Sequence, residues 1–171
     1  MPQDQSPISD TLRKLNYGIY VVTSLKSADE LTTRNADWVS ASTISWATQV
    51  SLNPDLLAVA VQKDSNLAET IQRSQNFALH ILAEGDRDVV KDFDGPADFD
   101  DDQVNGYDFD KGTSGAPILK QGLGVIECTL HDAITLDGDH MLFIGKPVAA
   151  DLRDPRAKSI AIEETEFEYG G

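Results

Sequence analysis

Residues 39–61 constrain the fold of this chain more than any other stretch. The first half, Val39–Val50, consists mainly of small and hydroxyl-bearing residues, and the second half, Leu56–Val61, is a run of aliphatic residues. Between them stands Ser51-Leu52-Asn53-Pro54, where the residue before proline disfavours helix and the Asn-Pro pair favours a turn. The stretch therefore predicts strands joined by a turn, with the aliphatic strand buried.

The hydroxyl-rich half of this stretch is compatible with a ligand. Small side chains at Ser40, Ala41, Ser42 and Thr43 allow a flat molecule to approach the backbone, whose amides can bond to its polar edge. The hydroxyls add donors without bulk. The same residues are also compatible with a hydroxyl-rich β-hairpin that binds nothing, so the stretch alone leaves both interpretations open.

Length and residue usage bound the class of protein. At 171 residues the chain suits one domain with a sizeable core, and we expect residues 1–171 to form a single domain. It has no run of about 18 apolar residues, so no membrane span is expected, and the polar N-terminus lacks the apolar core of a signal peptide. Cys128 is the only cysteine, which excludes an internal disulfide and a cysteine-based metal site. Because Cys128 lies in a strand-like run, we expect a buried, inert thiol, and these features favour a cytoplasmic location.

The chain is strongly acidic, with a formal net charge of −15. This charge argues against nucleic acid and anionic membranes as partners, because both are bound by clusters of lysine and arginine. Aspartate is densest between Asp86 and Asp110. A halophilic source would explain such a surface, since salt screens its self-repulsion, but an ordinary acidic surface explains it as well.

Strand patterns recur along the chain, and helical patterns are few. Short helices are expected at 9–15, 66–74 and 88–93, with Leu67 and Ile71 four residues apart on one face, and a further helix from Pro155. A hairpin connection is expected at 26–35, and Asp137-Gly138 is a hairpin signal. Many short strands with few helices predict a mainly β fold, a closed antiparallel barrel whose ends are covered by short helices. The strands are expected at 18–25, 38–44, 46–50, 56–61, 77–82, 124–135 and 140–150.

The segment from Asp94 to Lys120 lacks clear periodicity. It contains Gly, Pro and many Asp, with Phe99, Tyr107 and Phe109 dispersed among them. Segments this long without periodicity are usually functional lids or partly disordered. The aromatic residues favour a lid or an interface segment over a free linker.

A candidate anion site precedes the helix expected at 66–74. Free amides at a helix N-terminus can bind phosphate, and Lys63, Ser65 and Asn66 could complete such a site. The alternative is an ordinary helix cap, because Asp64, Ser65 and Asn66 are all good N-cap residues.

Histidine offers the other candidate chemistry. His140, at the start of a predicted strand, either faces a cleft, where it contacts a cofactor ring or donates a proton, or lies in solvent at a hairpin turn. His80 and His131 fall within strand patterns and are expected to be packed and hydrogen-bonded. The histidines have no carboxylates at metal-ligand spacing, so no metal site is expected. Glycine-rich dinucleotide fingerprints, a Walker A loop and a Gly-x-Ser-x-Gly elbow are absent from the sequence.

Taken together, these segments resemble the flavin reductase-like family, the FMN-binding split barrels. A further stretch, Ser114–Leu119 followed by Glu127-Cys128, resembles the reductase module of some flavodiiron proteins, and flavoredoxins are near relatives. The resemblance covers residues 10–150 and rests on these segments in order: Tyr17–Thr23, Val39–Thr43, Ser51–Pro54, Lys63–Ser65 with the helix to Ser74, Phe77–Leu82, and Gly138–His140 leading to Phe143–Gly145.

The resemblance implies a homodimer of split barrels with FMN, or alternatively FAD, bound near the dimer interface. Ser40, Ala41, Ser42 and Thr43 would line the isoalloxazine and phosphate side. The residues Ser51, Leu52, Asn53 and Pro54 would offer backbone groups to the ring edge. Lys63, Ser65 and Asn66 would lie at the phosphate, and His140 would stand near the nicotinamide of NADH or NADPH.

Two functions follow from the resemblance, and a split barrel whose pocket is empty or holds another ligand is a further alternative. The first is an NAD(P)H-dependent flavin reductase, in which a bound flavin accepts a hydride and the protein positions the reactants. The second is a flavoredoxin-like FMN electron carrier that acts with a redox protein partner. No protein nucleophile is required for either.

Overall fold

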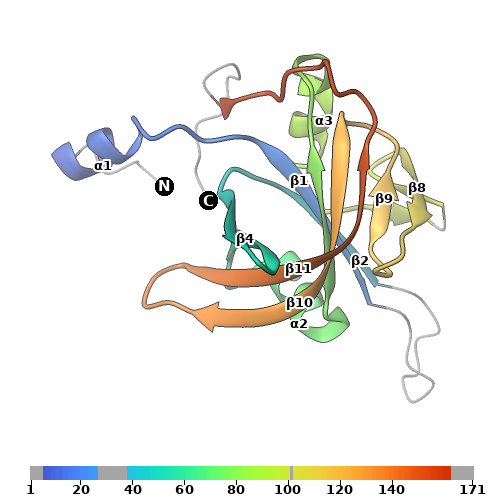
Figure 1. Cartoon of the computed structure of the whole chain (residues 1–171), viewed down its shortest axis with the longest axis horizontal. Coiled ribbons are helices and arrows are strands. Elements are labelled where there is room, and N and C mark those ends of the chain that lie inside the picture. Colours follow the sequence, from blue (N-terminus) through green and yellow to red (C-terminus); the bar gives the residue numbers. More distant parts are fainter. Residues whose placement is uncertain (1–5, 27–37, 101, 163–171) are drawn as a thin grey trace.

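A seven-stranded antiparallel sheet dominates the structure (Figure 1). The computed structural model describes residues 6–26, 38–100 and 102–162. Neighbouring strands follow the order β2-β1-β5-β10-β11-β4-β3, and each neighbouring pair is antiparallel. The strands are β1 (Tyr20–Lys26), β2 (Trp38–Ile44), β3 (Ala47–Leu52), β4 (Asp55–Gln62), β5 (Asn76–Ile81), β10 (Gly124–Thr135) and β11 (His140–Leu152).

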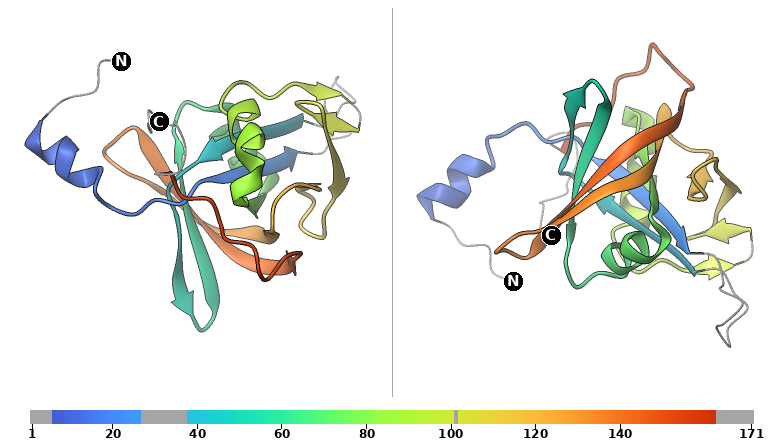
Figure 2. Two further views of the ribbon diagram at one scale, coloured as in Figure 1. Left: turned by 90° about the horizontal axis from the view of Figure 1, so that it is seen from above. Right: turned by 60° about the horizontal axis from the view of Figure 1, so that its bottom comes forward.

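The mainly β, split-barrel fold is confirmed, but the expectation of a closed barrel is wrong. β2 and β3 are the edges of the sheet, and within the described part of the chain they do not pair with each other. The chain passes from one edge to the other through Ser45 and Trp46, so the twisted sheet wraps around its core without closing (Figure 1, Figure 2). The segment after helix α3 (Arg87–Asp92) occupies the outer edge of β2, where the Thr43 N–H donates a 3.0 Å hydrogen bond to the Phe93 carbonyl.

Helix α2 (Asn66–Ser74) has the bounds that the sequence predicts, because it has strong start and stop signals. The Ser65 hydroxyl caps its first turn by accepting a hydrogen bond from the Ala68 N–H, and Gln75 ends it in a left-handed conformation. Leu67 and Ile71 are buried against the sheet, as their spacing indicates. A 3₁₀ turn, η1 (Glu84–Asp86), leads into α3, which was expected at 88–93.

Helix α1 (Pro7–Leu12) begins earlier than expected, because Ser6 rather than Ser9 or Asp10 caps it. The helix projects from the sheet, as Figure 2 shows from two directions, and none of its residues is buried. The helix expected from Pro155 is wrong as far as Ile162, since residues 155–162 form only turns, bridges and the start of a 3₁₀ turn. The hairpin connection expected at 26–35 lies outside the described residues, apart from Lys26 at the end of β1.

The long segment after α3 is more ordered than expected. Most of it is a small antiparallel sheet rather than a disordered segment, and a role as a lid stays a prediction. Phe99, Tyr107 and Phe109 are partly buried and pack against an apolar cluster of the same chain, and a role of the segment in an interface stays a prediction. The strands of this sheet are β6 (Phe99–Asp100), β7 (Gln103–Val104), β8 (Tyr107–Lys111) and β9 (Pro117–Leu119).

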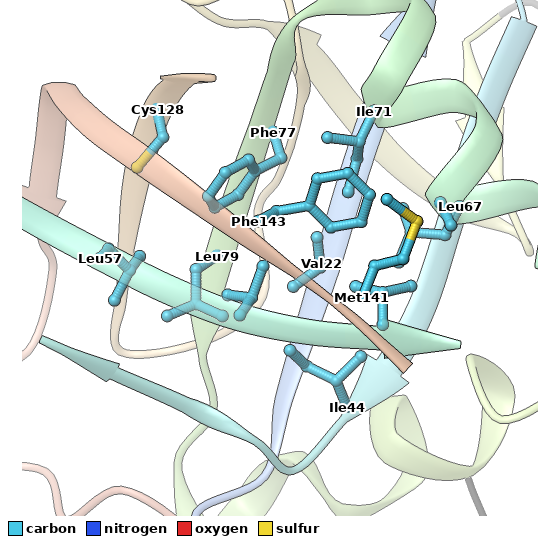
Figure 3. Close-up of a cluster of buried hydrophobic side chains, with 13 residues drawn as sticks. Val22, Ile44, Leu57, Leu67, Ile71, Phe77, Leu79, Cys128, Met141 and Phe143 are labelled. Atoms are coloured by element: carbon cyan, nitrogen blue, oxygen red, sulfur yellow. The ribbon is translucent and has the colours of Figure 1, made fainter. Parts of the chain in front are cut away.

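Two main apolar clusters form the core. One lies between the large sheet and α2, and includes Phe77, Phe143 and Cys128 (Figure 3). The other is built from α3, β1, β2 and the small sheet, and includes Phe93. Cys128 is fully buried, and burial, with the neighbouring charge of Glu127, raises the pKa of its thiol to about 12. The expectation of a buried thiol is confirmed. In the described part of the chain, every helix falls short of the length and apolarity that a membrane span needs.

Candidate functional site

A cavity of about 440 Å³ lies where the outer edge of β2 faces the start of α2. The C-terminal end of β4 forms its floor, and the loop after α3 closes its other side. The cavity therefore brings together two parts of the sequence that were singled out separately, the hydroxyl-rich strand and the helix cap. It is lined by residues 39–44, 60–62, 65–67 and 94–97.

Two of the hydroxyls on β2 hold the walls of the cavity together. The Ser40 hydroxyl is buried and lies 2.8 Å from the hydroxyl of Thr70 on α2. The Thr43 hydroxyl donates a 2.9 Å hydrogen bond to the Val90 carbonyl on α3. Ser42 is half-buried, and its hydroxyl makes only a long 3.3 Å contact with the Thr43 carbonyl. Ser42 is thus the hydroxyl best placed to exchange its contact for a ligand.

The backbone of β2 also presents hydrogen-bonding groups to the cavity side. The Thr43 N–H points away from β1, to the Phe93 carbonyl. In a strand, the N–H groups of residues two apart point to the same side, so the Ala41 N–H also points to the outer edge of β2. β1 is the one strand that pairs with β2 among the described residues. Ala41 has no side-chain atoms beyond Cβ, so a planar ligand can approach this edge closely.

The start of α2 supplies the cavity with amide donors. The Ser65 hydroxyl donates to the Gln62 carbonyl at 2.8 Å and accepts from the Ala68 N–H at 3.1 Å, so the cap interpretation of Ser65 is confirmed. The Ala68 N–H is taken up by this cap and the Glu69 N–H by the Ser65 carbonyl, so Asn66 and Leu67 provide the N–H groups that lack an acceptor within the helix, at the end that carries its partial positive charge. The helix cap and an anion site are therefore compatible, because Ser65 orients the first turn of α2 and this turn lines the cavity.

Five of the expected site residues lie elsewhere. The Lys63 ammonium donates to the Leu136 carbonyl in the β10–β11 hairpin and is not part of the cavity wall. Ser51–Pro54 form the end of the β3–β4 hairpin, where Leu52 is 82% exposed, and none of them lines the cavity. The turn predicted at Asn53-Pro54 is confirmed.

His140 lies beside the cavity rather than in its wall. It is the first residue of β11, it pairs with the cavity residue Gln62 on β4, and it is 7% exposed. Its Nδ1 lies 2.6 Å from the Asp139 carboxylate, and this hydrogen bond lowers the pKa of Asp139. Its ring centroid is 4.8 Å from that of Trp46. His140 is therefore held among its neighbours and is not a solvent-exposed turn residue.

The other two histidines differ in burial: His80 is buried and His131 is exposed. His80 is fully buried and hydrogen-bonded to the Val21 carbonyl and the Leu119 N–H, as expected, and burial lowers its pKa to about 4. His131 is exposed at an irregularity in β10, so the expectation that it is packed is wrong. The bulge there interrupts the alternation on which that expectation rested. Within the described ranges, no group of three His, Cys, Asp or Glu residues is arranged to hold a metal ion.

Sequence reasoning missed part of the cavity wall, namely Gln62 and the loop Asp94–Ala97. Partial burial raises the pKa of the Asp94 carboxyl. Asp94-Gly95-Pro96 signals a loop directly after a helix, and it begins the segment interpreted as a lid. The sequence held no sign that this loop folds back onto β2, because that contact depends on the hydrogen bonds from Thr43 to α3 and Phe93.

Comparison with known proteins shows which proteins this chain resembles. The chain is 35% identical over 102 residues to the stachydrine N-demethylase reductase subunit Stc3 of Rhizobium meliloti, covering 60% of this chain and 43% of that protein. It is 28% identical over 128 residues to diflavin flavoprotein A 1 of a Synechocystis species, covering 72% of this chain and 20% of that protein. The chain thus spans less than two thirds of the length of these relatives.

A solved structure has the same fold. The NADH:FAD oxidoreductase SgcE6 of Streptomyces globisporus, in complex with NAD and FAD fragments, superposes with a TM-score of 0.76 and 24% identity, over 100% of this chain and 95% of that chain. At this identity the likeness shows the fold alone. The family model described as "Flavin reductase like domain" matches residues 12–165, nearly the whole chain. The chain belongs to the family of flavin reductase-like domains.

Proposed function

We propose that this protein binds FMN in the cavity beside β2 and catalyses the reduction of flavin by NADH or NADPH. The observation that carries the proposal is the convergence of small hydroxyl residues, the outer edge of β2 at Ala41 and a helix N-terminus on one cavity. This donor set fits a planar ring system that carries a phosphate. FAD has the same ring and phosphate chemistry and is the alternative ligand. Membership of the family supports this function, and SgcE6 is an oxidoreductase of NADH and FAD.

The chain's own residues would divide the work of binding. The first-turn amides of α2 and the side chain of Asn66 would bind the phosphate, with Ser65 keeping that turn in place. Ser42 and the Ala41 N–H would bond to the polar edge of the ring. When bound, the flavin supplies the redox chemistry, by taking up a hydride and passing electrons on.

His140 would act on the side of the nicotinamide. Its Nδ1 lies 2.6 Å from the Asp139 carboxylate, and this hydrogen bond helps to hold the ring in place. A histidine oriented in this way can hold a nicotinamide carboxamide by a hydrogen bond and so keep the hydride donor aligned. Lys63 and Ser51–Pro54 would act indirectly, through the hairpins that they stabilise, since they do not line the cavity.

An anaerobic titration tests the function. The purified protein, with FMN added, is titrated with NADH and with NADPH while the flavin absorbance is followed. Bleaching at a stoichiometry near one donor per flavin supports the reductase. His140→Ala should slow the reduction about 10- to 100-fold and leave the FMN dissociation constant within about threefold. A protein that binds no FMN or FAD by calorimetry would contradict the whole proposal.

One observation favours a second function. The chain matches only a fifth of a diflavin flavoprotein, 20% of its length, so this type of domain also exists as one part of a longer flavoprotein. In the second function the protein is an FMN electron carrier that exchanges electrons with a redox protein partner. Binding of FMN without bleaching by NADH or NADPH would favour the carrier.

We also propose a homodimer of single-domain subunits located in the cytoplasm. The apolar residues Ile8, Leu12 and Leu15 are 73%, 53% and 55% exposed on the projecting N-terminal arm, which suits packing against a second copy. Light scattering should give about twice the 18.6 kDa subunit mass. Leu12→Asp should shift the protein toward the monomer, whereas Thr113→Asp, on an exposed turn elsewhere, should not.

A further inference from the structure

The charged side chain that lines the cavity is acidic. Asp94 comes shortly after helix α3, at the start of the loop that closes one side of the cavity. Among the described residues of the wall, it is the single one with a charged side chain, and the others are neutral. Lys63, the cation expected at the phosphate, lies outside the wall, and its ammonium donates to the Leu136 carbonyl. The described wall therefore brings a negative charge to the cavity without a positive side chain to balance it.

Backbone hydrogen bonds hold Asp94 at this place. Its N–H donates a 3.2 Å hydrogen bond to the Lys91 carbonyl, and the preceding Phe93 carbonyl accepts a 3.0 Å hydrogen bond from the Thr43 N–H on β2. Within the part of the chain that the structure describes, no hydrogen bond or ion pair engages the Asp94 carboxylate. Asp94 is exposed at the cavity rim, yet partial burial by the surrounding protein raises the pKa of its carboxyl. Its charge is therefore left to act on whatever enters the cavity.

The start of α2, also in the cavity wall, offers an anion only partial charge. The N–H groups of Asn66 and Leu67 lie at the end of the helix that carries roughly half an elementary charge. A phosphate monoester carries about −1.5 to −2 charges at pH 7, which is more than this helix end can balance. Because the cavity measures only about 440 Å³, a ligand that fills it reaches both α2 and the loop of Asp94. Charges so close together are incompletely screened at ordinary salt concentrations.

We propose that Asp94 is a specificity-determining residue, which makes the cavity discriminate between flavins by the charge of their phosphate. The inference rests on the proposed function, in which a flavin occupies this cavity with its phosphate at α2. Repulsion from the Asp94 carboxylate weakens the binding of FMN most, because its phosphate is a monoester. The phosphates of FAD are diesterified and carry less charge each, and riboflavin has no phosphate. Asp94 thus limits how tightly the cavity retains FMN, relative to both of the other flavins.

Calorimetric titration of the whole chain with FMN, FAD and riboflavin tests this discrimination. Asp94→Asn removes the charge and keeps the size of the side chain. It should bind FMN about three- to tenfold more tightly than the wild type, FAD with a smaller gain, and riboflavin within about twofold of the wild type. Asp94→Glu keeps the charge and should keep the wild-type ratios. Asp98→Asn makes the same change in net charge at an exposed residue outside the cavity wall, and should leave all three affinities unchanged.

Salt provides an independent measurement of the same repulsion. In the wild type, the affinity for FMN relative to riboflavin should rise between low and molar NaCl, because dissolved ions screen the charge of Asp94. The rise should be smaller in Asp94→Asn and should match the wild type in Asp98→Asn. Riboflavin corrects for any effect of salt on the binding of the ring system itself. A relative affinity for FMN that falls with salt in the wild type, as attraction to a cationic site requires, would overturn the proposal.

The outcomes separate this inference from the proposed function. An unchanged ratio of FMN to riboflavin affinity in Asp94→Asn, and in Asp94→Ser as a second neutral variant, would overturn the role of Asp94 and leave flavin binding intact. Equal losses of all three flavins in these variants would also overturn it, because the carboxylate would then accept a hydrogen bond from the flavin instead of repelling its phosphate. A wild type that binds none of the three flavins would refute the proposed function itself, and the role of Asp94 with it.

Discussion

Single hydroxyls in this protein have different roles although they follow one another in the sequence. Ser40 and Thr43 connect β2 to α2 and α3, and only Ser42 between them is left with a weak internal contact. Alternation places Ser40 and Ser42 on one face of β2 and Thr43 on the other, so Ser40 reaches α2 and Thr43 reaches α3. Some residues of this small polar run therefore hold the protein together, and others remain available for a ligand. Of the four residues predicted to bind the flavin, residues 40–43, the role is best supported for Ser42 and for the Ala41 N–H.

The cap of α2 can be separated from phosphate binding by comparing two serines. Ser65→Ala removes a cap at the cavity and should cost about 1 kcal/mol of stability, and it should weaken FMN about fivefold, because the amides of the first turn lose their fixed orientation. Ser6→Ala removes the equivalent cap of α1, far from the cavity. There the Ser6 hydroxyl accepts a 3.2 Å hydrogen bond from the Ser9 N–H. Calorimetry should show unchanged FMN affinity in Ser6→Ala, and equal losses in both variants would refute the α2 site.

His80 predicts a loss of stability in weak acid. Its pKa is about 4 in the folded protein, against about 6.5 when exposed, so the unfolded chain binds the proton first as the pH falls. The free energy of unfolding should be highest above about pH 6.5 and should fall by up to about 3 kcal/mol toward pH 4. Urea titrations across this range should show a smaller fall in His80→Gln, with His131→Gln matching the wild type. If the free energy of unfolding falls as much in His80→Gln as in the wild type, groups other than His80 cause the loss of stability.

At the scale of elements, the small sheet depends on contacts with the large one. The His80 ring accepts a hydrogen bond from the Leu119 N–H at 2.9 Å, and Arg153 donates to the Leu119 carbonyl at 2.8 Å. β9 is thereby fixed against β5 and the segment that follows β11. This is why a stretch with no internal periodicity is ordered: its partners lie elsewhere in the chain.

The crossing of β11 over the core makes Gly145 a sensitive position. A Cβ added there would lie 2.4 Å from a Phe77 ring carbon and 2.7 Å from the Cys128 Cβ. Gly145→Ala should therefore destabilise the protein by about 1–3 kcal/mol through overpacking. Gly138→Ala is the control, since a Cβ there would meet open space in the hairpin turn. Urea unfolding midpoints compare them, and a neutral Gly145→Ala would contradict the packing of β11 on β5.

For the whole molecule, the acid load is the property with the widest effect. Acidic residues number 29 against 14 basic ones, and the exposed aspartates are dense on the small sheet. Like charges on one surface repel each other, and dissolved salt screens them over roughly 10 Å at 0.1 M.

A salt series tests whether this repulsion limits stability. The melting temperature should rise between low and molar NaCl because screening relieves the repulsion in the folded state. A variant with Asp100→Asn, Asp108→Asn and Asp110→Asn, all at exposed positions, should show a smaller rise. A flat or falling melting temperature in the wild type would leave an ordinary acidic surface and remove the idea of a halophilic source.

The sequence by itself determined the local elements and the family. The bounds of α2 follow from its capping residues, which act between near neighbours, and the buried thiol follows from its place in a strand. The tertiary structure alone decided which of these elements meet. It places Asp94–Ala97 on the cavity, Lys63 on a neighbouring hairpin and Trp46 against His140. Each of these contacts joins residues distant in the chain, and such contacts depend on the twist of the sheet and the packing of its faces, which no local pattern encodes.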